Sequence, residues 1–173
     1  AVREIAGLVH RAPSDPPLGL AINVSLQQIA EPGLVDHLVR LVREHDLTPE
    51  SVVLEADEAS LLADPHHARH MVRGAKQHGI KLSLDDFGVG TTALGHVHEF
   101  ALDELKIDGA LVQALGHDHR TGALVGSIVH FANALGIRAV AEGIETSEQL
   151  NELRRSGCRF GQGYLMSPPL TAA

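Results

Sequence analysis

The sequence predicts an α/β protein whose parallel strands close into a TIM-like (β/α) barrel. Apolar runs of strand length alternate with helical patterns along the chain, which is typical of parallel strands joined by right-handed crossovers. Each of the six expected strands also ends in a polar or charged residue. The carboxyl ends of barrel strands form an active-site face, whereas a doubly wound sheet gathers its functional groups at one switch point. The distribution over all strands therefore favours a barrel.

The strands are expected to be short apolar runs, the first of which suits a strand buried on both faces. The expected strands cover residues 18–25, 51–55, 80–85, 102–107, 137–141 and 159–160. The polar residues at their ends are, in the same order, Asn23, Glu55, Asp85 with Asp86, Lys106, Glu142 and Gln162.

Helices are expected between the strands, because apolar residues recur there at helical spacing. One covers 34–42, a second opens at Asp64-Pro65 and closes at Gly79, a third covers 121–135, and a fourth runs from a cap at Ser147 to residue 155. In the third helix the apolar stripe is expected to comprise Leu124, Ile128, Phe131, Ala132 and Leu135. Residues 1–10 are expected to be the remnant of a helix, 12–17 a Pro-rich connector and 93–98 a short helix.

The composition fits one globular domain, with 44% hydrophobic residues in 173 and no Trp. The formal net charge of −8 disfavours binding to nucleic-acid polymers or anionic membranes, because phosphate contacts need a basic surface. Cys158 is the single cysteine, so no intrachain disulfide can form. With no apolar run of about 18 residues, the expectation is a cytoplasmic domain, either alone or as part of a larger or membrane-tethered protein.

Two adjacent carboxylates, Asp85 and Asp86, dominate the predicted site. Neighbouring strand residues point to opposite faces, so this pair can converge only where the strand stops and the chain turns. A helix cap is the alternative interpretation. Asn23, Glu55 and Glu142 add oxygen donors, a set that suits Mg²⁺ or Mn²⁺ rather than Zn²⁺.

The motifs around these residues resemble those of a known family. They are, in order, Ile22-Asn23-Val24-Ser25, Leu54-Glu55-Ala56-Asp57-Glu58, Leu84-Asp85-Asp86-Phe87-Gly88-Val89-Gly90, Leu105-Lys106-Ile107-Asp108, Ala141-Glu142-Gly143-Ile144-Glu145 and Gly161-Gln162-Gly163-Tyr164-Leu165. They are similar to V-N-L-S, L-E-I-T-E, L-D-D-F-G-T-G, L-K-I-D, A-E-G-V-E and Q-G-Y-L of EAL domains, the phosphodiesterases of the bacterial second messenger cyclic di-GMP.

The resemblance implies a role for each strand-end residue. It implies that Asn23, Glu55 and Asp85 bind a first metal ion, and that Asp85 and Asp86 bind a second. Glu142 would hold water or act as a base, Lys106 would position the attacking water, and Gln162 would support the guanine or the water network. Glu58 and Glu145 would contact the metal-binding residues without binding the metal ions themselves, and Glu58 would hold the loop after the Asp pair in place. The implied reaction is two-metal hydrolysis of cyclic di-GMP to linear pGpG.

The chain also departs from the family pattern. The E-A-L tripeptide, whose Glu would complete the first metal site, is absent, and the first strands of the barrel are missing with it. The loop after the Asp pair is altered at Val89 and at Thr91-Thr92-Ala93, and Gly109 stands where a basic or polar residue often follows L-K-I-D. Residues 1–173 are therefore expected to form one EAL-type domain fragment of weak or absent activity.

Two alternatives to an enzyme remain open: an inactive cyclic di-GMP receptor and a protein-interaction module. An incomplete barrel exposes unpaired strand edges, so a homodimer or a partner domain is expected to cover the open edge. The clustered histidines, among them His66, His67 and His70, are expected on solvated helix faces.

Overall fold

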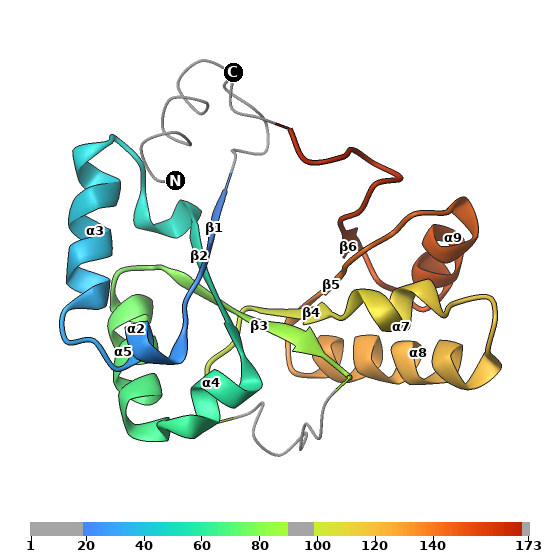
Figure 1. Cartoon of the computed structure of the whole chain (residues 1–173), viewed down its shortest axis with the longest axis horizontal. Helices are drawn as coiled ribbons and strands as arrows, with labels where there is room; N and C mark the ends of the chain where they lie inside the picture. The colour runs from blue at the N-terminus through green and yellow to red at the C-terminus, as the bar shows by residue number, and fades with distance from the viewer. Residues whose placement is uncertain (1–18, 90–98, 171–173) are drawn as a thin grey trace. The chain divides into compact units, whose positions relative to one another are not determined.

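The computed structural model describes residues 19–89 and 99–170. The expected helices at 1–10 and 93–98 and the connector at 12–17 lie outside these residues. The chain divides into two compact units, Ala1–Leu82 with Thr171–Ala173, and Ser83–Leu170. Strand β3 (Lys81–Phe87) contributes its first two residues to the first unit and the other five to the second (Figure 1).

The first unit alternates strands and helices as the sequence predicts. Its elements are β1 (Leu20–Asn23), α2 (Leu26–Ile29), α3 (Leu34–Glu44), the 3₁₀ turn η1 (Pro49–Ser51), β2 (Val52–Asp57), α4 (Glu58–Ala63) and α5 (Pro65–Gln77). β1 and β2 are parallel neighbours, with Asn23 opposite Glu55 in the register. The two strand-end residues named by the sequence therefore sit side by side.

The strands of the first unit bury one face, not two. In β2 the alternate residues Val52, Leu54 and Ala56 are buried, whereas the residues between them are partly exposed. In β1, Leu20 is buried but Ala21 and Asn23 are exposed. The expectation of burial on both faces was therefore wrong for the first strand, β1. Among the described helices, α4 packs against β2.

Helices α3 and α5 have the amphipathic pattern expected of them. α3 buries Val35, Leu38, Val39 and Val42, and α5 buries Ala68, Met71, Val72 and Ala75. Asp64 caps the start of α5 and accepts a hydrogen bond from the backbone N–H of His67 at 3.2 Å. Gly79 follows the end of α5 with a φ of +81°, a conformation that glycine adopts without strain.

The second unit holds the rest of the strand–helix alternation. After β3 come β4 (Glu104–Ile107), α7 (Gly109–Gln113), α8 (His119–Ala134), β5 (Arg138–Ala141), α9 (Ser147–Arg155) and β6 (Phe160–Gly161). β3, β4, β5 and β6 pair in this order, and every pair is parallel. The carboxyl ends of these four strands therefore lie at the same edge of the sheet.

α8 packs against β4 and β5, and this contact corrects one sequence expectation. The buried stripe of α8 consists of Val125, Ile128, Val129 and Ala132, whereas Leu124 and Leu135 are 44% and 47% exposed. Ile128 and Ala132 are thus confirmed as members of the stripe, whereas Val125 and Val129 were not expected in it. The helix is apolar on several sides, so its sequence alone does not single out the face that contacts the sheet.

The helix boundaries differ in small ways from the expectation. The cap of α9 is Thr146, one residue before Ser147, and Gln149 completes a capping box with it. Helices α2, α4 and α7 have four to six residues, which is too short for a helical period to show in the sequence. No helix among the described residues is long and apolar enough to cross a bilayer.

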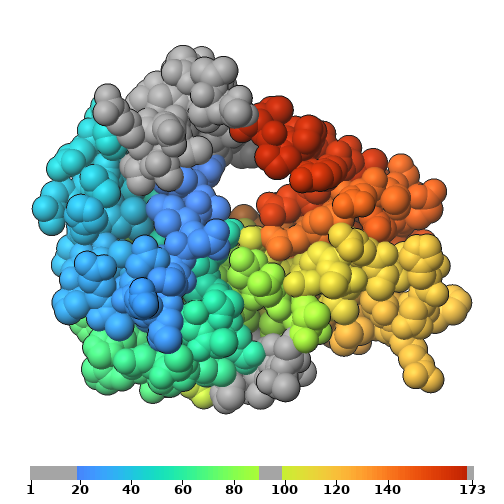
Figure 2. Space-filling model, in the orientation of Figure 1, coloured from blue at the N-terminus to red at the C-terminus, as the bar shows by residue number. Residues whose placement is uncertain are grey.

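The segment after β6 lies on the surface of the second unit, where it is coloured red in Figure 2. Tyr164 is 66% exposed and Leu170 is 82% exposed. Phe160 in β6 is 49% exposed, and the guanidinium of Arg138 lies 4.6 Å from the centre of its ring.

Candidate metal centre

Asp85 and Asp86 converge because β3 contains a bulge. In the register with β4, Leu84 is opposite Leu105 and Phe87 is opposite Ile107. Two residues of β3, Asp85 and Asp86, therefore lie opposite one residue of β4, Lys106. The extra residue cancels the alternation that would send adjacent side chains to opposite faces. Asp86 has a φ of +53°, in the left-handed region that aspartate tolerates better than most residues.

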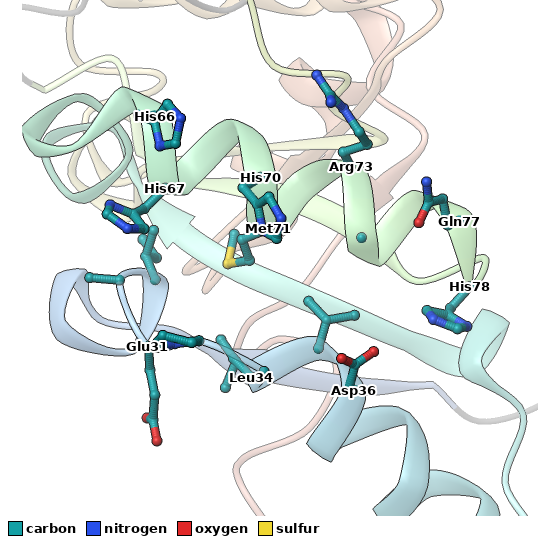
Figure 3. Close-up of a pocket in the computed structure, with 16 residues that line it drawn as sticks. Glu31, Leu34, Asp36, His66, His67, His70, Met71, Arg73, Gln77 and His78 are labelled. Carbon is teal, nitrogen blue, oxygen red and sulfur yellow. The ribbon is translucent and has the colours of Figure 1, made fainter.

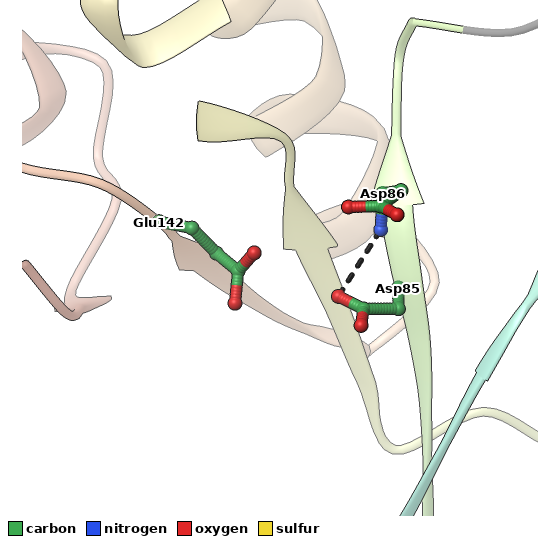
Figure 4. Close-up of side chains that lie close together, drawn as sticks. All are labelled: Asp85, Asp86 and Glu142. Atoms are coloured by element: carbon green, nitrogen blue, oxygen red, sulfur yellow. Dashed lines mark hydrogen bonds between the residues drawn. The ribbon is translucent and has the colours of Figure 1, made fainter. Parts of the chain in front are cut away.

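This bulge corrects the expected end of the strand. The sequence predicts that β3 stops at Asp85, but the strand continues to Phe87. The backbone N–H of Asp86 donates to Oδ1 of Asp85 at 3.1 Å, and this hydrogen bond orients the Asp85 carboxylate (Figure 4).

Glu142 completes a cluster of three carboxylates. One oxygen from each of Asp85, Asp86 and Glu142 lies within 4.8 Å of the others. Glu142 follows directly after β5, and Figure 4 shows its carboxylate turned toward the Asp pair. The residues come from β3 and from the end of β5, the strands on either side of β4.

Lys106, on β4, sits between these carboxylates. Its Nζ is 2.7 Å from Oε1 of Glu142 and 3.2 Å from Oδ1 of Asp85. The Lys106 side chain is 10% exposed, so its charge is held largely away from water. A buried ammonium needs such partners, because desolvating an isolated charge costs several kcal/mol.

The Gln162 side chain also contacts the carboxylate of Glu142. Its Nε2 donates to Oε1 of Glu142 at 2.7 Å, so this oxygen accepts from both Lys106 and Gln162. Gln162 follows β6, and its backbone N–H donates to Ala141 at the end of β5. Glu142 is thereby held in one orientation by two neighbouring strands.

The acid cluster perturbs Asp86. Burial raises the pKa of its carboxyl, and repulsion by Asp85, Asp108 and Glu142 raises it further. Asp108 directly follows β4, and it also caps α7 by accepting a hydrogen bond from the N–H of Ala110 at 2.6 Å. Asp108 is a site residue that the sequence reasoning did not assign; its position at the end of the Leu105–Asp108 motif was the available signal.

The cluster fits a hard divalent cation. Its donors are carboxylate oxygens, which Mg²⁺, Mn²⁺ and Ca²⁺ prefer, and no described cysteine or histidine joins the group. Lys106 supplies one positive charge against three carboxylates, so the cluster remains net negative. A divalent cation would offset the repulsion that raises the pKa of Asp86.

Asn23 and Glu55 belong to the first unit and are adjacent there. They are register partners at the carboxyl ends of β1 and β2, and the N–H of Val24 donates to the carbonyl of Glu55 at 2.8 Å. Parallel neighbours in register project their side chains from the same face of a sheet. The structure thus brings together two of the oxygen donors that the sequence assigned to a metal.

Glu58 and Glu145 occupy the starts of helical segments. Glu58 is the first residue of α4, after the Asp57 cap. Glu145 precedes the Thr146 cap of α9, and its N–H donates to the side chain of Gln149 at 2.8 Å. The loop that Glu58 is expected to brace includes residues 90–98, which lie outside the described residues.

Comparisons with known proteins agree with this geometry. A family model described as "EAL domain" matches residues 1–169. The cyclic di-GMP phosphodiesterase RocR of Pseudomonas aeruginosa is 35% identical over 154 residues, which are 89% of this chain and 39% of RocR. The chain thus spans about two-fifths of the length of that relative.

Two solved structures match over nearly the whole chain. The EAL domain of Mycobacterium smegmatis DcpA aligns with a TM-score of 0.92 and 31% identity, covering 99% of this chain and 77% of that one. A manganese and cyclic di-GMP complex of Klebsiella pneumoniae BlrP1 aligns with a TM-score of 0.85 and 31% identity, covering 94% and 41%.

These matches confirm the α/β class and the incomplete TIM-like barrel that the sequence predicts. The strands are parallel wherever their pairing is described, and the chain covers part of a solved EAL domain. The chain belongs to the EAL domain family.

Proposed function

We propose that this domain binds cyclic di-GMP and hydrolyses one of its phosphodiester bonds to give linear pGpG, with weak activity in residues 1–173 alone because they lack the Glu of the E-A-L tripeptide. The proposal rests on the group formed by Asp85, Asp86, Lys106 and Glu142. At the carboxyl ends of neighbouring strands, three carboxylates lie close together and the Lys106 ammonium contacts two of them. Such a combination can bind a phosphodiester through metal ions and stabilise the charge that develops on it.

The proposal assigns Mg²⁺ or Mn²⁺ as the cofactor. Asp85 and Asp86 would hold one ion, and the register partners Asn23 and Glu55 of the first unit would also be ligands of a metal ion. When bound, the ions would polarise the phosphodiester and lower the pKa of a coordinated water. The relative BlrP1 was crystallised with manganese and cyclic di-GMP.

The residues of this chain then have separate tasks. The oxygen of a water molecule forms a bond to phosphorus, and the bond from phosphorus to the 3′ oxygen breaks. Glu142 accepts a proton from that water, and the 3′ oxygen takes a proton from solvent. Lys106, 2.7 Å from Glu142, positions the water and stabilises negative charge, while Gln162 keeps the Glu142 carboxylate in place and contacts the substrate.

Turnover tests this directly. The chain is incubated with cyclic di-GMP and Mn²⁺, and the linear product is measured by chromatography. Asp85→Asn should abolish turnover, whereas Asp36→Asn, an exposed carboxylate in the first turn of α3, should leave it unchanged. Binding of cyclic di-GMP without turnover would assign a receptor function, and neither binding nor turnover would overturn the proposal.

The proposal includes a second copy of the chain as partner. β6 is the last strand of its sheet and pairs with β5 through Phe160 and Gly161. Exposed apolar side chains flank it, including Tyr164 at 66% and Met166 at 51%. An exposed edge with apolar neighbours favours association. Sedimentation should show a dimer that Phe160→Lys weakens; a monomer at all concentrations would contradict this part.

We propose a cytoplasmic location for the domain, alone or within a larger or membrane-tethered protein, because its proposed substrate is a bacterial second messenger. Fractionation of cells that produce the parent protein tests this part. The domain should be accessible to protease only after the inner membrane is opened.

A further inference from the structure

The first unit contains a histidine-lined groove outside the carboxylate cluster. The groove has a volume of about 490 Å³ and lies between α5 and the segment from the end of α2 into α3. His66, His67 and His70 lie in the first two turns of α5 and line the groove, and Figure 3 shows His67 on the side of the helix that faces the α2–α3 segment. α5 is fixed in orientation, because its opposite face is buried.

We propose that His66, His67 and His70 form a binding site for a borderline transition-metal ion such as Zn²⁺ or Ni²⁺. Imidazole nitrogens prefer these ions, whereas the carboxylate cluster of the second unit suits hard cations. The inference goes beyond the phosphodiesterase function and does not depend on it.

His67 is held in the way that metal-binding histidines are usually held. Its Nδ1 lies 2.7 Å from Oδ2 of Asp64, and its backbone N–H donates to Oδ1 of the same carboxylate at 3.2 Å. Metal-binding histidines commonly donate their other ring N–H to a carboxylate, which fixes the tautomer and the ring. In the neutral tautomer whose Nδ1–H donates to Asp64, Nε2 of His67 carries the lone pair that a metal ion would bind.

His66 lies at a suitable distance from His67. The centres of their rings are 5.5 Å apart and the ring planes are nearly perpendicular, at 83°. Two imidazoles that share a tetrahedral zinc ion, each with a Zn–N bond of about 2 Å, have ring centres about 5 Å apart. A small change of side-chain torsion would let both rings bind one ion.

His70 supplies the third imidazole. It lies four residues after His66 and three after His67, and residues at these spacings are neighbours on a helix surface. Two histidines four residues apart on one helix are a recurrent zinc-binding arrangement. In the described residues the three histidines do not yet form a closed triad, so their side chains must rotate to bind an ion.

A competition experiment separates this site from the carboxylate cluster. The full chain with Asp85→Asn is titrated with Zn²⁺ in excess Mg²⁺, by calorimetry or against a chromogenic chelator. One Zn²⁺ per chain is expected, with tetrahedral absorption bands when Co²⁺ replaces Zn²⁺. His66→Ala, His67→Ala and His70→Ala should each weaken binding by at least about tenfold.

Two further variants make the test specific. His37→Ala removes an exposed histidine of α3 that does not line the groove, and it should leave Zn²⁺ binding unchanged. Asp64→Asn preserves the helix cap, since asparagine caps as well as aspartate, but it weakens the hold on His67 and should lower affinity by about tenfold. Absence of stoichiometric Zn²⁺ binding, or equal loss in His37→Ala, would overturn the proposal.

Discussion

The Nζ atom of Lys106 lies 2.7 Å from Oε1 of Glu142 and 3.2 Å from Oδ1 of Asp85, and so joins residues of three consecutive strands or strand ends. Lys106 is opposite the bulge that holds Asp85 and Asp86. The ammonium thus places a positive charge in contact with two carboxylates of this cluster, and its removal should have consequences for stability as well as for activity.

Lys106→Met should destabilise the metal-free protein by about 1–3 kcal/mol, because it leaves carboxylates partly buried without their charged partner. Added Mn²⁺ should recover much of this loss. Urea unfolding in EDTA and in Mn²⁺ measures both effects. Arg40→Met, which removes an exposed charge from α3, serves as the control and should change little. Equal midpoints for Lys106→Met and the parent in EDTA would contradict the assigned role.

The raised pKa of Asp86 predicts a dependence of stability on pH in the metal-free protein. Burial is the larger cause, followed by repulsion from Asp85, Asp108 and Glu142. The folded state holds the Asp86 proton more strongly than the unfolded state, whose carboxyl has the ordinary value of 3.8. This contribution is therefore present at low pH and is lost as the pH rises from 3.8 through the raised pKa.

Asp86→Asn should remove that dependence and make the metal-free protein more stable than the parent at neutral pH. Asparagine also tolerates the positive φ of this position, so the bulge should persist. Urea midpoints measured in EDTA across the acid range provide the test. Parallel pH profiles for the variant and the parent would count against the repulsion described here.

Asp57 should show the opposite pH dependence. Burial by itself raises the pKa of its carboxyl, but hydrogen bonds from the side chain and backbone of Ser60, both at 2.7 Å, outweigh this and lower the pKa. The stabilisation is present above the ordinary value of 3.8 and is lost as the pH falls through the lowered pKa.

Asp57→Ala should cost about 1 kcal/mol by removing the cap of α4. Asp57→Asn should keep most of the cap and lose the pH dependence, since asparagine does not ionise in this range. Urea unfolding at neutral and acid pH separates the two effects. If both variants lost the same stability at neutral pH, the capping role would be wrong.

Gly143 is expected to position Glu142 through its backbone. It has a φ of +66°, and a Cβ added there would lie 3.4 Å from the Cα of Gly109. Gly143→Ala should destabilise the protein by about 1–2 kcal/mol, the cost of a left-handed alanine, and should reduce turnover by displacing its neighbour Glu142.

Gly109→Ala is the matched control for this contact. A Cβ at Gly109 would meet the carbonyl of Glu142 at 3.8 Å and the Cα of Gly143 at 3.9 Å, both ordinary contacts. The variant should fold and turn over as the parent does. Urea unfolding and the product assay are applied to both variants, and similar losses in the two would refute the conformational argument.

Much of the fold follows from local sequence. The strand positions were predicted within one or two residues for β4 and β5, because short apolar runs bounded by turn residues are a strong local signal. The end of α5 at Gly79 was likewise predicted from the sequence, and the positive φ of this glycine agrees with that prediction. The face that α8 buries was not, because several sides of that helix are apolar.

The sequence by itself determined which residue types end the strands, and therefore that Asp85, Asp86, Lys106, Glu142 and Gln162 lie at one edge of a parallel sheet. Only the tertiary structure decided how they meet. The bulge opposite Lys106 turns two adjacent carboxylates toward Glu142, and Asp108 joins them from the end of β4. Bulges and charge contacts depend on how one strand pairs with the next, and this pairing brings together residues that lie far apart in the sequence.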